Sequence, residues 1–447
     1  MVSAVHSEDR PGSGIGSVFG APAHAAWSLA DSAFVCFLLV IFVTTAPFAT
    51  RDPVTLASGE SGFAETGDLL RQVAYLGSFL MVAVAAIRVA GFRALLCIPP
   101  LLAALLAWCM LSAAWAAAPQ VVFRRAVLEI IVVMSAMMSV RMLGMDRSLT
   151  LLRGVLGAVL VVNWVSIPLV HNAIHLPGEI DPVLVGDWRG LYFHKNIAGS
   201  VCAITAILFF FQALKARPFL NAAFCAGAIG FTIMTASKAS IGLLPVGIAT
   251  ACLYRVAWRR GIDRAIVALV LLLVAVLAAL ILIANAHFIS HTLQDPTQLT
   301  GRTAIWQGEV AFIRNHFWLG GGYGSFSDTG APSLLHNYVA DKWVQNISHG
   351  HNAYLQLAVT IGAIGFAIAM LALLAEPARA FWRFDVTSID ARAILFAIFV
   401  FMVLHNFLES DFLEGDDPAW VAFLLMLAML RAIASGGGTR MPQPARN

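Results

Sequence analysis

Residues 348–365 read Ser348-His349-Gly350-His351-Asn352-Ala353-Tyr354-Leu355-Gln356-Leu357-Ala358-Val359-Thr360-Ile361-Gly362-Ala363-Ile364-Gly365. The segment begins where a polar, aromatic-rich stretch ends, and it continues as an apolar run. Ser348 suits the N-cap of a helix. On such a helix His351 and Gly362 lie about three turns apart and nearly in line, with Gly365 close to the same line. The pattern predicts an imidazole on the first turn of a membrane helix, on a face whose small residues allow close helix contact.

The composition is typical of a membrane protein. Of the 447 residues, 60% are hydrophobic and 12% are charged, and the mean hydropathy is +0.81. A soluble protein of this length does not need so much apolar sequence. The net charge of +3 is too small to favour a nucleic-acid partner. We therefore expect a polytopic protein whose surface is largely covered by lipid.

Apolar runs long enough to cross a membrane recur along the chain and predict about twelve helices. They lie near residues 27–48, 69–89, 94–115, 121–143, 149–170, 196–216, 219–236, 239–254, 264–286, 351–375, 391–408 and 418–434. The sequence thus predicts an all-α polytopic membrane protein with tails at 1–26 and 435–447, a transmembrane domain over 27–434 and a large loop over 287–350, between the ninth and tenth helices.

The basic residues predict the orientation of these helices. With the N-terminus inside, 18 of the 28 Lys and Arg residues fall on the cytoplasmic side and 10 fall outside. This is the positive-inside bias, so both tails should be cytoplasmic and the large loop should lie outside. Cations outside are disfavoured by the same rule, and an anionic ligand is the simplest reason for them. Snorkelling or salt bridging is the alternative for each. The outer cations include Arg124, Arg125, Arg189, Lys195, Lys238 and Arg302.

The large loop is too long and too aromatic to be a simple connector. Its tryptophans, among them Trp306 and Trp318, suit either stacking on sugars or anchoring at the membrane interface. The run 320–322 of three glycines is not a nucleotide-binding loop, since no strand precedes it and no Lys follows in the required place. A turn that allows close backbone approach is the better interpretation.

His351 is the candidate for proton transfer. Near a helix N-terminus the dipole disfavours the imidazolium, so a neutral ring can accept a proton from a hydroxyl. The same dipole and the outer arginines would favour a phosphate-bearing leaving group. His349 and His351 could also be read as metal ligands, but no third ligand is evident, and no metal is expected.

Taken in order, these segments resemble the bacterial O-antigen ligase and Wzy polymerase superfamily, with its ExoQ-type exopolysaccharide polymerases. The family signature is His, then Asn, Ser or Gln, nine residues, Gly, two residues and Gly, and residues 351–365 match it in full. Residues 189–199 resemble a family segment containing His-Lys-Asn, with one residue fewer after the Arg. Residues 237–240, 301–306, 320–326 and 406–410 also resemble family segments, so the resemblance covers about residues 100–430.

The resemblance implies a GT-C-like scaffold and a cofactor-free, metal-independent, inverting glycosyl transfer at the periplasmic face of the bacterial inner membrane. The donor would be a glycan on undecaprenyl pyrophosphate. His351 would orient or deprotonate the acceptor hydroxyl. Arg189 and Arg302 would bind the pyrophosphate, with Lys195 and Lys238 as further phosphate-binding candidates. The secondary site candidates are Asn196, Asn352, Glu409, Arg124 and Arg125.

Polymerase and ligase share this chemistry and differ in the acceptor. A polymerase uses another lipid-linked repeat unit, and a ligase uses the lipid A core. Residues 194–196 and 237–240 favour the exopolysaccharide polymerase by family analogy, with a chain-length-regulating protein and membrane lipids as partners. A transporter would also have about twelve spans, but no repeated halves are evident and the ionisable residues gather at one face. A non-catalytic scaffold or glycan-binding subunit is the third alternative.

Overall fold

The computed structural model of the chain describes residues 27–49, 69–179, 182–262, 266, 280, 302–327, 334–338, 350–383 and 389–434. Both expected tails, almost all of the expected helix at 264–286 and much of the expected loop at 287–350 lie outside these residues. The described part of the chain is helical, and its only strand-like feature is one isolated bridge between Ile174 and Trp188.

Apart from α12 and α15, the longer helices lie in the expected apolar runs; the run at 264–286 is almost entirely outside the described residues. Their bounds are α1 (Leu29–Phe42), α4 (Leu69–Ala90), α5 (Pro100–Leu111), α6 (Pro119–Leu169), α7 (Lys195–Ala213), α8 (Pro218–Met234), α9 (Lys238–Arg259), α12 (Arg302–Asn315), α14 (Ala353–Ala369), α15 (Glu376–Trp382), α16 (Ile389–His405) and α17 (Pro418–Ala434). A π-helical segment, Met370–Ala375, joins α14 to α15. The helix α12 lies inside the expected loop, where no helix was predicted.

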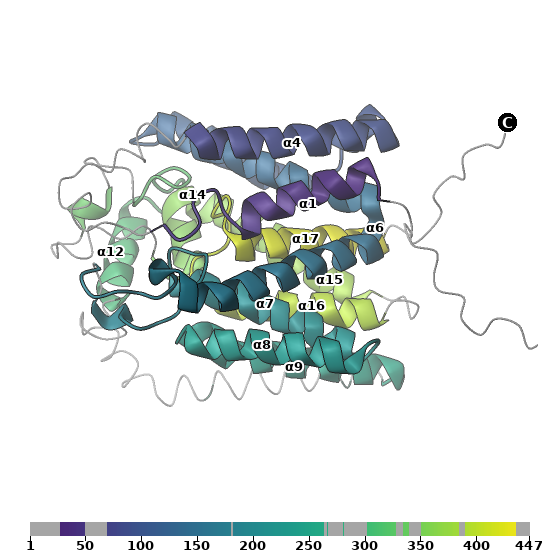
Figure 1. The fold of residues 1–447 in the computed structure, drawn as a ribbon. Coiled ribbons are helices and arrows are strands. Elements are labelled where there is room, and N and C mark those ends of the chain that lie inside the picture. Colours follow the sequence, from purple (N-terminus) through teal and green to yellow (C-terminus); the bar gives the residue numbers. More distant parts are fainter. Residues whose placement is uncertain are drawn as a thin grey trace, which may run out of the picture.

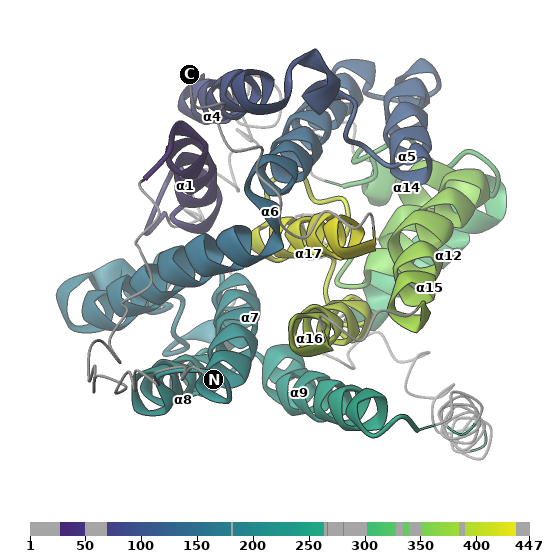
Figure 2. The ribbon, with the colours of Figure 1, turned by 90° about the vertical axis from the view of Figure 1, so that its right-hand side faces the viewer.

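Most of the helices run side by side in an elongated bundle, and α12 lies across one end of it (Figure 1). We call this the α12 end and the other the far end. Viewed along the bundle, α17 occupies the middle, with α6, α7 and α16 around it (Figure 2). Every residue of α17 from Ala419 to Leu430 is buried, as expected for a central helix.

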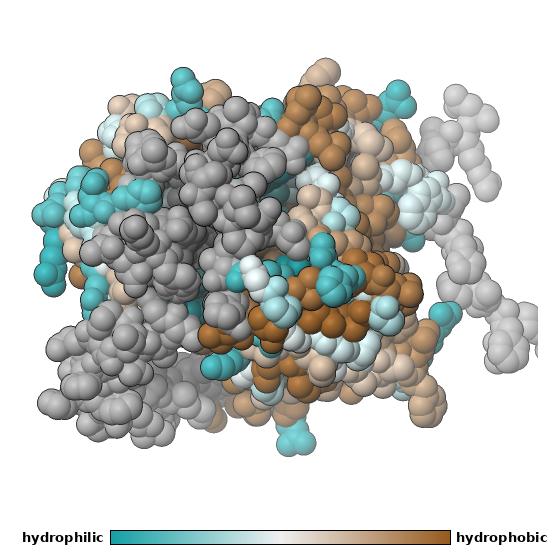
Figure 3. Space-filling view, turned by 60° about the vertical axis from the view of Figure 1, so that its left-hand side comes forward, coloured by the Kyte–Doolittle hydropathy of each residue, from teal (hydrophilic) through white to brown (hydrophobic). Residues whose placement is uncertain are grey.

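The outer helices present apolar side chains to their surroundings. Among the described residues, five helical segments are long and apolar enough to cross a membrane: α4, α6, α7, α9 and the continuous stretch Ala353–Trp382. Large side chains such as Leu76 and Leu80 on α4 and Leu253 on α9 are exposed, and apolar surface covers much of the described bundle in Figure 3. The all-α membrane fold is therefore confirmed, whereas the number of crossings and their orientation stay predictions.

The long helix α6 contains two of the expected spans. Gly144 interrupts it with φ of 74° and ψ of 172°, which is not helical. This conformation favours glycine, and Gly144 divides α6 into two helical halves. The predicted boundary between residues 143 and 149 agrees with this break.

The expected position of His351 on a first helical turn is wrong. The helix α14 begins at Ala353, and the side-chain oxygen of its N-cap, Asn352, accepts hydrogen bonds from the backbone N–H groups of Tyr354 and Leu355, both at 3.1 Å. His351 precedes the cap in the left-handed region, with φ of 52°. Asn352 is as good an N-cap as a serine and stands closer to the apolar run. The predicted cap, Ser348, lies outside the described residues.

Gly362 also departs from the expected regular helix. It breaks α14 with φ of 64°, and the segment following α12 packs directly against the break. Three backbone hydrogen bonds of 2.8 Å join them: Gly321 N to Val359 O, Gly322 N to Thr360 O, and Ala363 N to Phe317 O. A Cβ on Gly362 would lie 2.3 Å from the carbonyl oxygen of Trp318. The close backbone approach predicted for residues 320–322 is thus confirmed.

Replacing Gly362 with alanine should destabilise the protein by about 1–3 kcal/mol, because the new Cβ would overlap the Trp318 backbone and φ would be unfavourable. The measurement is the Tm of the detergent-purified protein. Gly77→Ala on α4 is the matched control, since a Cβ there meets no described atom within 4 Å. Equal Tm values for the Gly362→Ala variant and the wild type would contradict the close contact.

Candidate active site

The carboxylate of Glu409 lies at the centre of a polar cluster at the α12 end. It belongs to the segment between α16 and α17 and is only 4% exposed. Its Oε2 lies 2.9 Å from His351 Nδ1. Its Oε1 accepts hydrogen bonds of 2.8 Å from Arg302 Nη2 and from Asn196 Nδ2. One carboxylate therefore joins residues that are far apart in the sequence.

Each partner of Glu409 stands at the start of a helix. Asn196 is the second residue of α7, Arg302 is the first residue of α12, and His351 directly precedes the N-cap of α14. The bundle brings these three helix ends together at its α12 end. Because the side chains leave from helix termini, they meet outside the apolar middle of the bundle.

Backbone hydrogen bonds hold the Glu409 segment against the start of α14. The N–H of Ala353 donates to the carbonyls of Asn406, at 2.9 Å, and of Glu409, at 3.0 Å. The N–H of Asn352 donates to Ser410 Oγ at 3.0 Å. Asn352 thus caps α14 and also ties it to the segment that carries Glu409, which is a positioning role for this secondary candidate.

The surroundings of Glu409 keep it ionised. Burial raises the pKa of this carboxyl, but the hydrogen bond with His351 and the positive charge of Arg302 more than offset it, and the pKa is held well below its usual range. An ionised carboxylate can only accept hydrogen bonds, so Nδ1 of His351 must carry the proton in its hydrogen bond with Glu409. In the neutral ring Nε2 is then the basic nitrogen.

Arg189 and Lys195 belong to a second cluster, in the segment between α6 and α7. The Arg189 side chain is buried, its guanidinium pairs with Glu179 at 3.0 Å, and its Nε donates to Asn172 O at 2.7 Å. Lys195 Nζ pairs with Asp187 at 2.5 Å. Arg189 and Lys195, two of the four cations predicted to bind phosphate, are therefore each paired with an acid of the segment between α6 and α7.

The other predicted cations lie near the starts of α6 and α9. Lys238 is exposed as the first residue of α9. Arg124 and Arg125 lie near the start of α6, where Arg125 donates a hydrogen bond to the carbonyl of Gly324. The structure thus brings His351, Arg302, Glu409 and Asn196 into one cluster. Within the described ranges, no three His, Cys, Asp or Glu side chains are grouped in a way that could hold a metal.

Two residues near the cluster were not among the site candidates predicted from the sequence. His194 caps α7 by accepting a hydrogen bond from Asn196 N, and burial lowers its pKa to about 3, which keeps it neutral. Glu309 is fully buried, and neither of its carboxyl oxygens has a hydrogen-bond partner in the described part of the chain. A Cβ on Gly350 would lie 2.0 Å from Glu309 Oε1, so this carboxyl packs against Gly350, the residue before His351 in the chain.

A helical spacing in the sequence could have identified Glu309. It was overlooked because residues 287–350 were expected to form a loop. Arg302, Trp306 and Glu309 lie on one face of α12, at positions i, i+4 and i+7. Arg302 bonds to Glu409, and Trp306 Nε1 donates to Gly350 O at 2.9 Å. This face of α12 therefore contacts Glu409 at its first residue and Gly350 at Trp306 and Glu309.

Comparison with known families supports the resemblance found in the motifs. Residues 222–370 match the family model described as O-antigen ligase (Wzy_C). The matched segment contains Arg302 and His351, whereas Asn196 and Glu409 lie outside it. No curated protein sequence matches the chain. The match bears out the predicted resemblance over residues 222–370, and it supports a membrane enzyme of the O-antigen ligase or polymerase type.

The buried Glu309 should make stability depend on pH. Burial raises its pKa to about 8, against about 4.3 in an unfolded chain. Between these values the folded protein keeps a proton that the unfolded chain has lost, so stability should fall as the pH rises from about 5 to about 8, by about 1 kcal/mol per pH unit. The measurement is the Tm of wild type and Glu309→Gln across this range.

The Gln variant removes the titrating group and should lose this part of the slope. Asp146→Asn replaces an exposed carboxylate at the far end and should keep the wild-type slope. If Glu309→Gln and wild type show parallel curves from pH 5 to 8, Glu309 is not a neutral acid in the folded protein.

Proposed function

We propose that this chain, which carries an O-antigen ligase family segment, polymerises glycan repeat units that are linked to undecaprenyl pyrophosphate. The observation that supports this most is the pair of bonds from Glu409 to His351 and to Arg302. Glycosyl transfer needs a base for the acceptor and a cation for the leaving group. One carboxylate positions both.

In the proposed reaction His351 acts as the general base. Glu409 holds the proton on Nδ1, which directs the basic Nε2 to the acceptor hydroxyl. The hydroxyl gives its proton to Nε2 as its oxygen forms a bond to the anomeric carbon of the donor. The bond from that carbon to the pyrophosphate oxygen breaks with its electron pair, and attack from the opposite face inverts the configuration.

Arg302 is the proposed ligand of the departing pyrophosphate. Its guanidinium has five N–H donors, of which Nη2 serves Glu409 and Nη1 serves the carbonyl of Leu408. The side chain is 20% exposed, so other donors can reach a ligand at the cluster. A fixed guanidinium would stabilise the negative charge that develops on the leaving oxygens.

Arg189 and Lys195 have a different place in the proposal. Because the Arg189 guanidinium is buried against Glu179, a direct contact with pyrophosphate would require this pair to open. Its pairing favours a role in holding the segment before α7 in place. Lys195 is also paired, with Asp187, but its side chain is partly exposed and it adjoins Asn196, which donates a hydrogen bond to Glu409, so it is the second cation that we place near the donor phosphates.

Transfer to the lipid A core is the second candidate function. The matched family model is described as O-antigen ligase, and this favours the ligase, while the family-like segments 194–196 and 237–240 favour the polymerase. Both reactions need a lipid-linked donor whose pyrophosphate lies at the membrane boundary. The cluster at the ends of α7 and α14 suits such a donor in either case.

A deletion strain complemented with variants tests the proposed function. His351→Ala should lower transfer by about 10³–10⁴-fold, to a small residual rate, because no general base remains, and Arg302→Lys should lower it by about 10²-fold because a single ammonium lacks the planar fork that reaches Leu408, Glu409 and phosphate in fixed directions. Exopolysaccharide, lipopolysaccharide and lipid-linked intermediates are measured. The amount of each variant in the membrane is the control.

The products distinguish the candidate functions. Loss of long polysaccharide with accumulation of single lipid-linked repeat units supports the polymerase. Long glycan that stays on undecaprenyl pyrophosphate beside bare lipid A core supports the ligase. Normal polymers in cells that carry only the His351→Ala variant would contradict both, and a transport assay would be the next experiment.

Glu409→Gln should lower transfer by about 10²–10³-fold while the protein still inserts, because the neutral amide no longer holds His351 and Arg302 by charge. The decisive measurement is a double-mutant cycle with His351→Ala, whose effects should be far from additive. Glu376→Gln is the matched control, since Glu376 pairs with Arg431 in a more exposed ion pair. Additive losses would show that Glu409 does not act through His351.

A further inference from the structure

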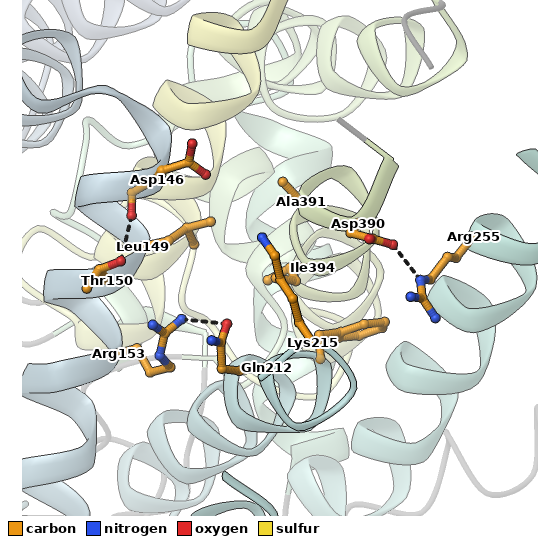
Figure 4. A pocket seen from close by; sticks show the side chains of 11 residues that line it. Asp146, Leu149, Thr150, Arg153, Gln212, Lys215, Arg255, Asp390, Ala391 and Ile394 are labelled. Atoms are coloured by element: carbon orange, nitrogen blue, oxygen red, sulfur yellow. Dashed lines mark hydrogen bonds and ion pairs between the residues drawn. The ribbon is translucent and has the colours of Figure 1, made fainter. Parts of the chain in front are cut away.

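A polar pocket of about 260 Å³ lies at the far end of the bundle, away from the Glu409 cluster. It is formed where the second half of α6, the end of α7, the end of α9 and the start of α16 meet (Figure 4). Its polar lining residues are Asp146, Thr150, Arg153, Gln212, Lys215, Arg255 and Asp390. The proposed function uses none of them.

The ion pairs leave this pocket with a small positive charge. Asp390 is neutralised by Arg255, at 2.6 Å, and by Arg259, at 2.8 Å. Arg153, on α6, donates a hydrogen bond to the neutral Gln212 at 3.1 Å. Lys215, just after the end of α7, also lines the pocket (Figure 4). Outside the Asp390 ion pairs, the charged lining residues are two cations, Arg153 and Lys215, and one carboxylate, Asp146, so the pocket suits a group with a single negative charge.

An apolar groove of about 360 Å³ continues from this pocket along the outside of the bundle. Its lining residues are Thr150, Arg153, Gly154, Gly157, Ala158, Val161, Phe209 and Phe224, so Thr150 and Arg153 belong to both spaces. Phe209 and Phe224 stack at 4.8 Å and form one wall. The floor is low because Gly154, Gly157 and Ala158 are small.

The length of the groove corresponds to one leaflet of a bilayer. The α6 residues that line it run from Thr150 to Val161, which on a helix is about 16 Å. Half of the hydrocarbon core of a membrane is about 15 Å. The polar pocket at one end and the acyl-length groove beside it thus match the two parts of a phospholipid.

We propose that the pocket and groove bind one anionic glycerophospholipid, with its phosphodiester between Arg153 and Lys215 and an acyl chain along Gly154, Ala158 and Val161. The guanidinium of Arg153 suits phosphate oxygens, and Lys215 adds a second charge. Gly154, Ala158 and Val161 are exposed on the outer face of α6, where lipid surrounds the protein. A second copy of this chain packing against the small residues is the competing occupant.

Filling the groove tests the proposal without disturbing the fold. A Cβ on Gly154 meets no described atom within 4 Å, so Gly154→Leu can be accommodated and should occupy the place of the acyl chain. Gly77→Leu is the matched control, because Gly77 is also exposed on an outer helix with open space around it. Arg153→Gln together with Lys215→Gln removes the charges that face the phosphodiester.

The measurement is native mass spectrometry of the purified full chain after addition of phosphatidylglycerol, phosphatidylethanolamine or glycerol 1-phosphate. We expect wild type and Gly77→Leu to retain one phosphatidylglycerol. Gly154→Leu and the double Gln variant should retain at least tenfold less, and glycerol 1-phosphate should not be retained, because it lacks the acyl chain.

Three results would overturn the proposal. Equal retention by Gly154→Leu and wild type would exclude the groove as the site. Equal retention of phosphatidylethanolamine would show that the pocket does not select an anionic lipid. A wild-type dimer that becomes monomeric only in Gly154→Leu would assign the groove to a second copy of the chain.

Discussion

The ionised carboxylate of Glu409 is the constraint on which the site depends. A charge in so buried a position is costly unless hydrogen bonds and opposite charges replace the water that it has lost. Glu409 obtains them from Asn196, Arg302 and His351, which come from three different parts of the chain. The α12 end of the bundle is therefore held in the arrangement in which His351 and Arg302 lie side by side.

The glycines of the family signature act through the backbone. Gly362 lets the Trp318 carbonyl approach a broken helix, and Gly365 has no Cβ where the ring of Trp108 packs, only 2.6 Å from that position. These contacts hold the segment that follows α12 against α14. Since α12 carries Arg302 to Glu409, close backbone packing several residues away from His351 helps to place the proposed leaving-group cation.

The membrane fold was predictable because lipid imposes a simple rule on the sequence. A buried helix in a bilayer must satisfy its backbone internally and present apolar side chains over a set length. Hydropathy therefore located α4, α7 and α17, and even the division of α6 near Gly144. The helix α12 was missed because it is amphipathic, short and outside the apolar runs, and hydropathy does not register such an element.

The sequence by itself determined that the chain is an all-helical membrane protein, that it resembles the O-antigen ligase family, and that His351 and Arg302 are site candidates, because length, hydropathy and motif spacing are local properties. Only the tertiary structure decided the partners. It placed His351 before the helix rather than on it, paired Arg189 with Glu179 and set Glu309 beside Gly350. Such pairings depend on which helix ends meet, and no spacing along the chain specifies that.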